Sequence, residues 1–318
     1  MNKLKNIVHK NFQLLSGEII SVNISFQTFG LDINEGPTVV INHSLTGNSN
    51  VAGNNGWWKN LIGPNKMICT NKFCIICINI PGNGIEDFDF NKNWVLNDVA
   101  RIFIKTLKKL NIKKVHSLIG GSIGGGLVWE MGILEPNYFK NLVPLASDYK
   151  SSDWLISNTY LQNLILINSK NPINDARVHA MLTYRNPKSL NKRFNFKINA
   201  ENNTMEVINW LEFHGSKLKK SFSLNSYIHM NNLLSTIGLI HKNRNDFKSL
   251  INKITSKIHL VGIDSDLLFP NFVIRKTYDY FSKIKKDIYY HKIKSDHGHD
   301  AFLIEFNKIE EKISKIFK

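Results

Sequence analysis

The fold is decided by the stretch Ser117-Leu118-Ile119-Gly120-Gly121-Ser122-Ile123-Gly124-Gly125-Gly126. An apolar run over residues 115–119 is typical of a buried strand, and a helical pattern begins at Leu127. Between them, Gly120-x-Ser122-x-Gly124 fits a nucleophile elbow, the tight strand-to-helix turn that exposes a serine hydroxyl above a sheet. Glycine is needed on both sides of the serine because the turn is strained and side chains would collide with the neighbouring strand and helix.

Apolar segments on either side of the elbow alternate with helical patterns. We expect strands at residues 38–42, 73–80, 142–146, 257–263 and 287–293, and helices at residues 95–110, after the elbow and at the C-terminus. Residues 16–30 alternate between polar and apolar side chains, which predicts an exposed antiparallel pair. Because the inner strands are continuously apolar and alternate with helices, the sequence predicts an α/β fold with a mostly parallel sheet and helices on both faces.

The strand–helix alternation stops between residues 151 and 252, where the sequence is polar and helical in pattern. We interpret residues 151–252 as a helical cap inserted into one core domain, which comprises residues 1–150 and 253–318. The chain has 318 residues, of which 42% are hydrophobic, so it can bury a large core.

The formal net charge is +16, which raises nucleic acid as a partner. The lysines are spread along the whole chain, however, and no recognised nucleic-acid motif is present, so we expect no nucleic-acid partner. No segment approaches the roughly 20 apolar residues of a membrane span. The first residues lack the apolar core of a secretory signal. A cytoplasmic protein without membrane attachment is therefore expected.

Two of the three cysteines form the pattern Cys74-x-x-Cys77 inside a predicted strand. Residues three apart on a strand face opposite sides of the sheet, so these thiols are poorly placed to form a disulfide or to share a metal ion. We interpret the cysteines as small apolar residues.

The serine of the elbow needs a base and an acid to become a nucleophile. Asp264 and Asp266 follow the next-to-last predicted strand, and His297 and His299 follow the last. Because parallel strands end at one edge of the sheet, these loops are expected to meet Ser122 there. The chain order serine, acid, histidine is the one this kind of sheet uses. Spacing alone does not choose between the two aspartates or between the two histidines.

An oxyanion hole requires two backbone N–H donors, one directly after the nucleophile and one from an early strand-loop. Ile123 is expected to supply the first donor, and the region of Leu45, after the strand at residues 38–42, the second. A histidine at a strand end is more often structural than catalytic, so we interpret His43 as structural.

With these residues in place, the chain resembles the homoserine O-acetyltransferases of methionine biosynthesis, a branch of the α/β-hydrolase fold, almost from end to end. The resemblance implies that Asp266 and His299 are the triad members. It rests on His43-Ser44-Leu45-Thr46-Gly47, Gly56-Trp57-Trp58, the elbow, Ala176-Arg177, Leu182-Thr183-Tyr184-Arg185, Asp264-Ser265-Asp266-Leu267-Leu268-Phe269-Pro270 and Gly298-His299-Asp300-Ala301-Phe302-Leu303.

In that family, the residues that match Thr46, Arg177, Tyr184 and Asp300 line the homoserine site. The chemistry suits this role, because homoserine carries a carboxylate and an ammonium group that a guanidinium and a carboxylate can hold at opposite ends. The chain departs from the family in a shorter loop after Pro81 and in Gly126-Leu127, which we expect near the acyl donor.

The resemblance implies transfer of an acetyl group from acetyl-CoA to the hydroxyl of L-homoserine by a ping-pong mechanism, giving O-acetyl-L-homoserine. Acetyl-CoA would be a co-substrate, no cofactor or metal would be bound, and the chain would form a homodimer. The alternatives are a succinyl-CoA-dependent homoserine or serine acyltransferase, and an esterase that uses the same triad. A non-enzymatic basic binding protein ranks far behind these.

Overall fold

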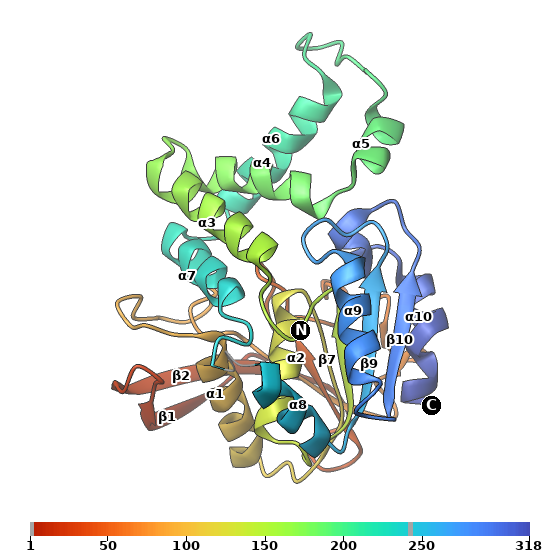
Figure 1. Ribbon diagram of the computed structural model, residues 1–318. Helices are drawn as coiled ribbons and strands as arrows, with labels where there is room; N and C mark the ends of the chain where they lie inside the picture. Colours follow the sequence, from red (N-terminus) through yellow and green to blue (C-terminus); the bar gives the residue numbers. More distant parts are fainter. Residues whose placement is uncertain (1–2, 241–243) are drawn as a thin grey trace.

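The computed structural model describes residues 3–240 and 244–318, and its centre is an eight-stranded sheet with the order β1-β2-β6-β3-β7-β8-β9-β10 (Figure 1). The strands of this sheet are β1 (Lys5–Gln13), β2 (Ile19–Gly30), β3 (Thr38–Asn42), β6 (Cys74–Ile78), β7 (Val115–Gly121), β8 (Phe139–Leu145), β9 (Lys257–Ile263) and β10 (Ile288–Ile293). Two short strands, β4 (Ile62–Gly63) and β5 (Ile68–Cys69), form a small separate sheet.

The six strands from β6 to β10 in this order pair in parallel, which confirms the mostly parallel sheet predicted from their continuous hydrophobicity. Their carboxyl ends therefore share one edge of the sheet. The predicted antiparallel pair within residues 16–30 is wrong, because β2 is a single strand whose antiparallel partners are β1 and β6. Most side chains of β1 are exposed at the sheet edge, so its sequence has no apolar run to reveal it.

Helices and a long loop cover the two faces of the sheet. One face packs against α1 (Leu96–Lys109), α2 (Ile123–Leu134), α8 (Arg244–Lys253) and α9 (Asn271–Phe281). The other face packs against residues 51–68, α10 (Phe306–Ile313) and the 3₁₀ helix η2 (Ser314–Phe317). Strand β3 shows why the sequence is apolar throughout: Val40 enters the first core, whereas Val39 and Ile41 enter the second.

The two cysteines of the C-x-x-C pattern follow the same rule. Cys74 lies in the first core and Cys77 in the second, so their side chains are on opposite faces of β6. Both thiols are free and buried, as the strand alternation predicts.

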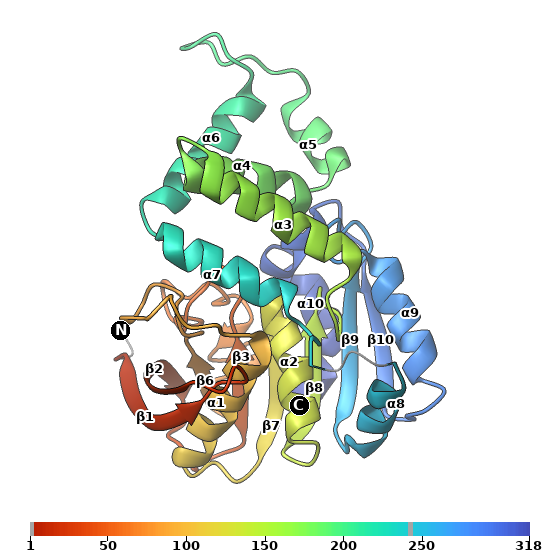
Figure 2. The same ribbon diagram turned by 60° about the vertical axis from the view of Figure 1, so that its left-hand side comes forward.

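In the described part of the chain, the cap consists of the five helices α3 to α7. They lie over the carboxyl ends of the strands (Figures 1 and 2). The helices are α3 (Asp153–Asn168), α4 (Pro172–Tyr184), α5 (Pro187–Phe194), α6 (Glu206–Lys219) and α7 (Leu224–Ser235). Local sequence fixes several of their starts: the side chains of Ser152, Asn186 and Ser223 accept N-capping hydrogen bonds at α3, α5 and α7.

Helix α8 does not belong to the cap, although all but its last residue lies within the segment 151–252 that the sequence assigns to the cap. Its Phe247 packs against Tyr149 with a ring-centroid distance of 4.5 Å. Its buried apolar side chains join the core on the face of the sheet that α1, α2 and α9 also cover. The amphipathic pattern of a helix that covers a sheet is the same as that of a cap helix, so sequence alone does not separate them. In the part of the chain that the structure describes, no helix is long and apolar enough to cross a membrane.

The connection from β8 to the cap is held by a buried carboxyl group. Oδ1 of Asp148 accepts hydrogen bonds from the Tyr149 N–H at 2.9 Å and from the Thr277 hydroxyl at 2.8 Å. Burial raises the pKa of Asp148 to about 7, and the hydrogen bonds only partly oppose this. The folded state therefore binds the proton more tightly than the unfolded state, and the stability that this proton supplies is lost as the pH rises through about 7.

We expect Asp148→Asn to unfold with a higher free energy than the wild type at pH 8, and the difference to shrink toward pH 4. The amide keeps an acceptor for both hydrogen bonds and carries no charge to bury. Urea denaturation at pH 4, 6 and 8 measures the difference, with the exposed Asp279→Asn on α9 as the matched control. A difference that does not change with pH would contradict the assignment.

Candidate active site

Ser122 lies at a strained turn between β7 and α2. Its backbone has φ 61° and ψ −128°, and its N–H donates to the Leu145 carbonyl at 3.0 Å. A Cβ atom on Gly124 would lie 2.4 Å from the Asn42 carbonyl oxygen, and one on Gly120 would lie 2.4 Å from the Gly124 oxygen. The flanking glycines are thus required because the helix start and the neighbouring strand approach the turn closely, as the elbow motif predicts.

The structure brings His299 together with Asp266. The distance from His299 Nδ1 to Asp266 Oδ2 is 2.7 Å, and both side chains are almost fully buried. Asp266 Oδ1 also accepts the backbone N–H groups of Leu268 and Phe269, each at 2.8 Å. These bonds fix the carboxylate in one orientation, so it can hold the imidazole with Nε2 as the free nitrogen.

The two neighbours that spacing left open have other contacts. Asp264 accepts the Ser295 N–H at 2.9 Å and so joins the ends of β9 and β10. His297 is half-buried, and its backbone N–H donates to the Ser295 hydroxyl at 3.0 Å. Among these four described residues, the hydrogen bond joins Asp266 and His299, the pair that the resemblance implies.

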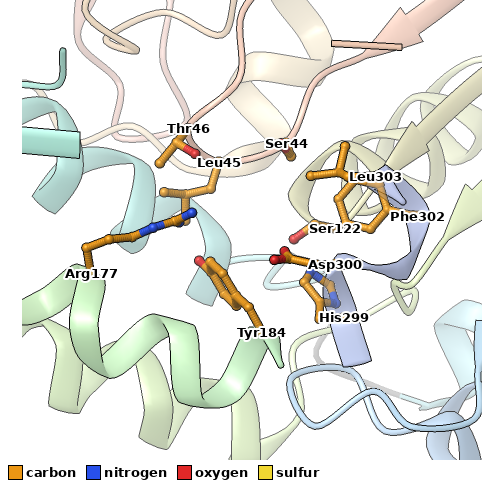
Figure 3. A pocket seen from close by; sticks show the side chains of 10 residues that line it. All are labelled: Ser44, Leu45, Thr46, Ser122, Arg177, Tyr184, His299, Asp300, Phe302 and Leu303. Atoms are coloured by element: carbon orange, nitrogen blue, oxygen red, sulfur yellow. The ribbon is translucent and has the colours of Figure 1, made fainter. Parts of the chain in front are cut away.

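A small cavity of about 40 Å³ opens above the serine (Figure 3). His299 Nε2 is buried and has no hydrogen-bond partner among the described residues, and His299 and Ser122 line the same cavity. This nitrogen is therefore available as a proton acceptor for the serine. The lining comprises Ser44, Leu45, Thr46, Ser122, Arg177, Tyr184, His299, Asp300, Phe302 and Leu303.

The two residues predicted to form the oxyanion hole lie next to the serine. Leu45 is in the cavity wall, on the loop that follows β3. Ile123 is the first residue of α2, where backbone N–H groups lack partners within the helix and the helix dipole is positive. Such N–H groups suit the binding of a negatively charged oxygen.

His43 has a structural position. Its Nε2 accepts the Ile80 N–H at 2.9 Å, and Nδ1 contacts the Ser44 carbonyl at 2.8 Å. Burial lowers the pKa of His43 to about 4, so the ring is neutral at physiological pH. It connects the loops after β3 and β6 and does not line the cavity.

The four residues predicted to bind the second substrate all reach the cavity. The Arg177 guanidinium lies 5.3 Å from the centre of the Tyr184 ring, and Thr46 faces them from the loop after β3 (Figure 3). Asp300 already has a partner, because its Oδ2 lies 3.1 Å from Arg185 Nε. Sequence analysis missed this role of Arg185, although the residue directly follows Tyr184 in a motif it identified.

Gly126, which we expect near the acyl donor, does not line the described cavity. A Cβ atom on Gly126 would lie 2.7 Å from the Ile237 side chain, which places this glycine against the segment after α7. The loop at Pro81 also packs on α7, where its carbonyl contacts His229 Nε2 at 3.0 Å. Neither departure from the family pattern lines the described cavity.

The fold and the site define an enzyme of the α/β-hydrolase class. The sequence profile described as alpha/beta hydrolase fold matches residues 37–306, so the chain belongs to this family. The predicted fold class is therefore confirmed.

Curated relatives show which members of this fold the chain is similar to. A homoserine O-acetyltransferase of Carboxydothermus hydrogenoformans is 27% identical, with 99% of this chain and 94% of that protein covered. One of Methanococcus vannielii is 29% identical, with 95% and 70% covered. These comparisons confirm the resemblance to homoserine O-acetyltransferases.

Solved structures support the fold. The homoserine O-acetyltransferase from Bacillus anthracis has a TM-score of 0.89 at 17% identity, covering 99% of this chain and 97% of its own. Esterase E22 has a TM-score of 0.89 at 16% identity, covering all of both chains. A homoserine O-acetyltransferase and an esterase thus share this architecture, and the fold alone does not distinguish an acyltransferase from a hydrolase.

We expect a fluorophosphonate probe to label Ser122, because the buried base beside it makes this hydroxyl nucleophilic. Mass spectrometry of the labelled peptides locates the adduct. His299→Ala is expected to abolish labelling, and His297→Ala, the matched control, to retain most of it. Equal labelling of the two histidine variants would contradict the assignment of the base.

Proposed function

We propose that the protein transfers an acetyl group from acetyl-CoA to the hydroxyl of L-homoserine and thereby serves methionine biosynthesis. The observation that carries this proposal is one cavity that combines Ser122 and His299 with a guanidinium and a carboxylate. A plain esterase site needs the first two groups only. The curated relatives, which bear the name homoserine O-acetyltransferase over nearly the whole chain, support the same choice.

In the first half of the reaction, the Ser122 hydroxyl attacks the thioester carbonyl of acetyl-CoA while His299 Nε2 takes its proton. Asp266 stabilises the imidazolium that forms. The negative charge on the carbonyl oxygen is bound by the N–H groups of Leu45 and Ile123. When the tetrahedral intermediate collapses, the coenzyme leaves as a thiol with the proton from His299, and the acetyl group remains on the serine.

In the second half, the hydroxyl of homoserine replaces the coenzyme above the acetyl-serine. His299 takes the hydroxyl proton, the oxygen attacks the acyl carbon, and O-acetyl-L-homoserine leaves as the proton returns to Ser122. The reaction is ping-pong, because the first product departs before the second substrate reacts. Acetyl-CoA is a co-substrate in this scheme, and the steps use only side chains and backbone N–H groups of the chain.

The acceptor is held by its two charged groups. Arg177 is placed to bind the carboxylate, and Asp300 to bind the ammonium group, each through charge-assisted hydrogen bonds. Thr46 and the Tyr184 hydroxyl complete the polar wall between them. Each charge-assisted bond contributes about 1.5–3 kcal/mol, enough for the acceptor hydroxyl to compete with water for the acyl-serine.

An esterase is the second candidate, because the fold shared with esterase E22 is compatible with hydrolysis as well as with transfer. Such an enzyme would use the same triad, with water in place of homoserine. A succinyl donor or a serine acceptor would need the same charged groups and a differently sized cavity.

The proposed function predicts rapid release of one equivalent of coenzyme from acetyl-CoA alone and sustained release once homoserine is added. Thiol release is followed with acetyl-CoA or succinyl-CoA, with and without homoserine or serine, and the acetyl adduct on Ser122 is sought by mass spectrometry. Ser122→Ala is the control and is expected to release none. Sustained release without any acceptor would indicate the esterase.

Removal of the Arg177 side chain is expected to act mainly on the acceptor. In Arg177→Ala we expect the KM for homoserine to rise about tenfold or more, because one charge-assisted bond is lost. We also expect a larger fraction of the acyl-enzyme to be hydrolysed. Steady-state kinetics together with acetate measurement test this. Unchanged homoserine kinetics would place the acceptor site elsewhere.

A further inference from the structure

Arg185 connects the cap to the loop that carries the catalytic histidine. Its Nε atom lies 3.1 Å from Asp300 Oδ2, and the two side chains are only 15% and 14% exposed. The distance is that of an ion pair, but the N–H is not aligned for a hydrogen bond within the described residues. The guanidinium lies 5.7 Å from the ring centre of Trp210 on α6, which is the distance of a cation–π contact.

The backbone on both sides of this ion pair is closely packed. Gly298, which precedes His299, has φ +67°, and a Cβ atom on it would lie 2.8 Å from the Tyr184 carbonyl oxygen. The end of α4 therefore rests directly against the catalytic loop. Asn186, which follows Arg185 in the chain, donates a hydrogen bond from its side-chain amide to the carbonyl of Ser265 at 3.2 Å. Ser265 directly precedes Asp266. Arg185 therefore lies between Tyr184, which packs against the loop of His299, and Asn186, which binds the loop of Asp266.

Charges of both signs surround the Asp300 carboxylate. Burial raises the pKa of Asp300, and Asp266 on the acid loop acts in the same direction. Arg185 opposes this most strongly, followed by Arg177 on α4 and the adjacent His299. The Tyr184 hydroxyl also interacts electrostatically with the carboxylate. A buried carboxyl group that lost its main cation would take up a proton more readily, and a neutral carboxyl group binds ammonium poorly.

We propose that Arg185 is a positioning residue that keeps Asp300 ionised and oriented to accept the ammonium group of the acceptor. Arg185 acts through Asp300, because Asp300 lines the described cavity and Arg185 does not. The inference rests on the proposed function for the identity of the acceptor. Through Arg185, the cap thus contributes to acceptor binding by controlling the protonation state of the Asp300 carboxyl group.

The test compares Arg185→Gln, Arg185→Lys and Arg193→Gln. Arg193 is the matched control, because its guanidinium lies 5.4 Å from the same Trp210 ring and it has no ion pair in the described chain. In Arg185→Gln we expect the KM for homoserine to rise about tenfold or more near pH 6 and to recover in part as the pH increases and Asp300 ionises. The kcat at saturating homoserine is expected to change much less. Arg185→Lys restores the low KM, because it restores the positive charge.

Two results would overturn the proposal. One is an increase in the KM of Arg185→Gln that is the same at every pH. The other is an increase no larger than that of Arg193→Gln.

A second measurement separates this inference from the proposed function. The carboxyl group of Asp300 is titrated by carbon NMR in the wild type, in Arg185→Gln and in the folded charge-conserving Arg185→Lys. We expect its midpoint to lie at higher pH in Arg185→Gln and near the wild-type value in Arg185→Lys. This shift supports the role of Arg185 even if homoserine is not the acceptor. Identical midpoints in all three proteins would overturn it even if homoserine transfer is confirmed.

Discussion

The strained backbone of Ser122 is the constraint on which the rest of the site depends. A residue at φ 61° persists only if its surroundings hold it, and here β3, β7 and the start of α2 approach so closely that Gly120 and Gly124 admit no side chain. The same close approach places Ser122 at the carboxyl edge of the sheet, directly before the first N–H groups of α2. Loops from β3, β9 and β10 reach this point because parallel strands end at one edge.

The cap supplies the guanidinium that lies opposite the Asp300 carboxylate of the core. The core provides the serine, the histidine and the buried aspartate, which are common to transferases and esterases of this fold. Helix α4 adds Arg177 and Tyr184 to the cavity, and its end contacts the loop of His299 through Arg185. In this account, selectivity for an amino-acid acceptor arises where α4 meets the catalytic loop.

Sequence predicted the parts of the fold that are buried and continuous. The strands β3 and β9 have the predicted bounds, because strands buried on both faces are apolar throughout. Strand β1 was not predicted, because an exposed edge strand has a mixture of polar and apolar side chains. Helix α8 was placed in the cap because its pattern does not reveal which surface it covers.

The sequence identified the loops that form the site. Local spacing did not identify which residue of each loop acts there. Asp264 and Asp266 share one turn, and only the three-dimensional arrangement directs one to Ser295 and the other to His299. The resemblance implies Asp266, and this is the aspartate whose carboxylate contacts His299 in the structure. The pairing of Arg185 with Asp300 joins residues far apart in the chain, and neither local pattern nor motif indicates which arginine faces the carboxylate.

The central claim is that the site holds an acceptor hydroxyl in preference to water. The most direct measurement is the partition of labelled acetyl groups from acetyl-CoA between O-acetylhomoserine and acetate as homoserine is increased. The account predicts that the product becomes almost entirely O-acetylhomoserine at saturating homoserine, with a plateau that reflects binding at Arg177 and Asp300. Acetate as the main product at every homoserine concentration would contradict it.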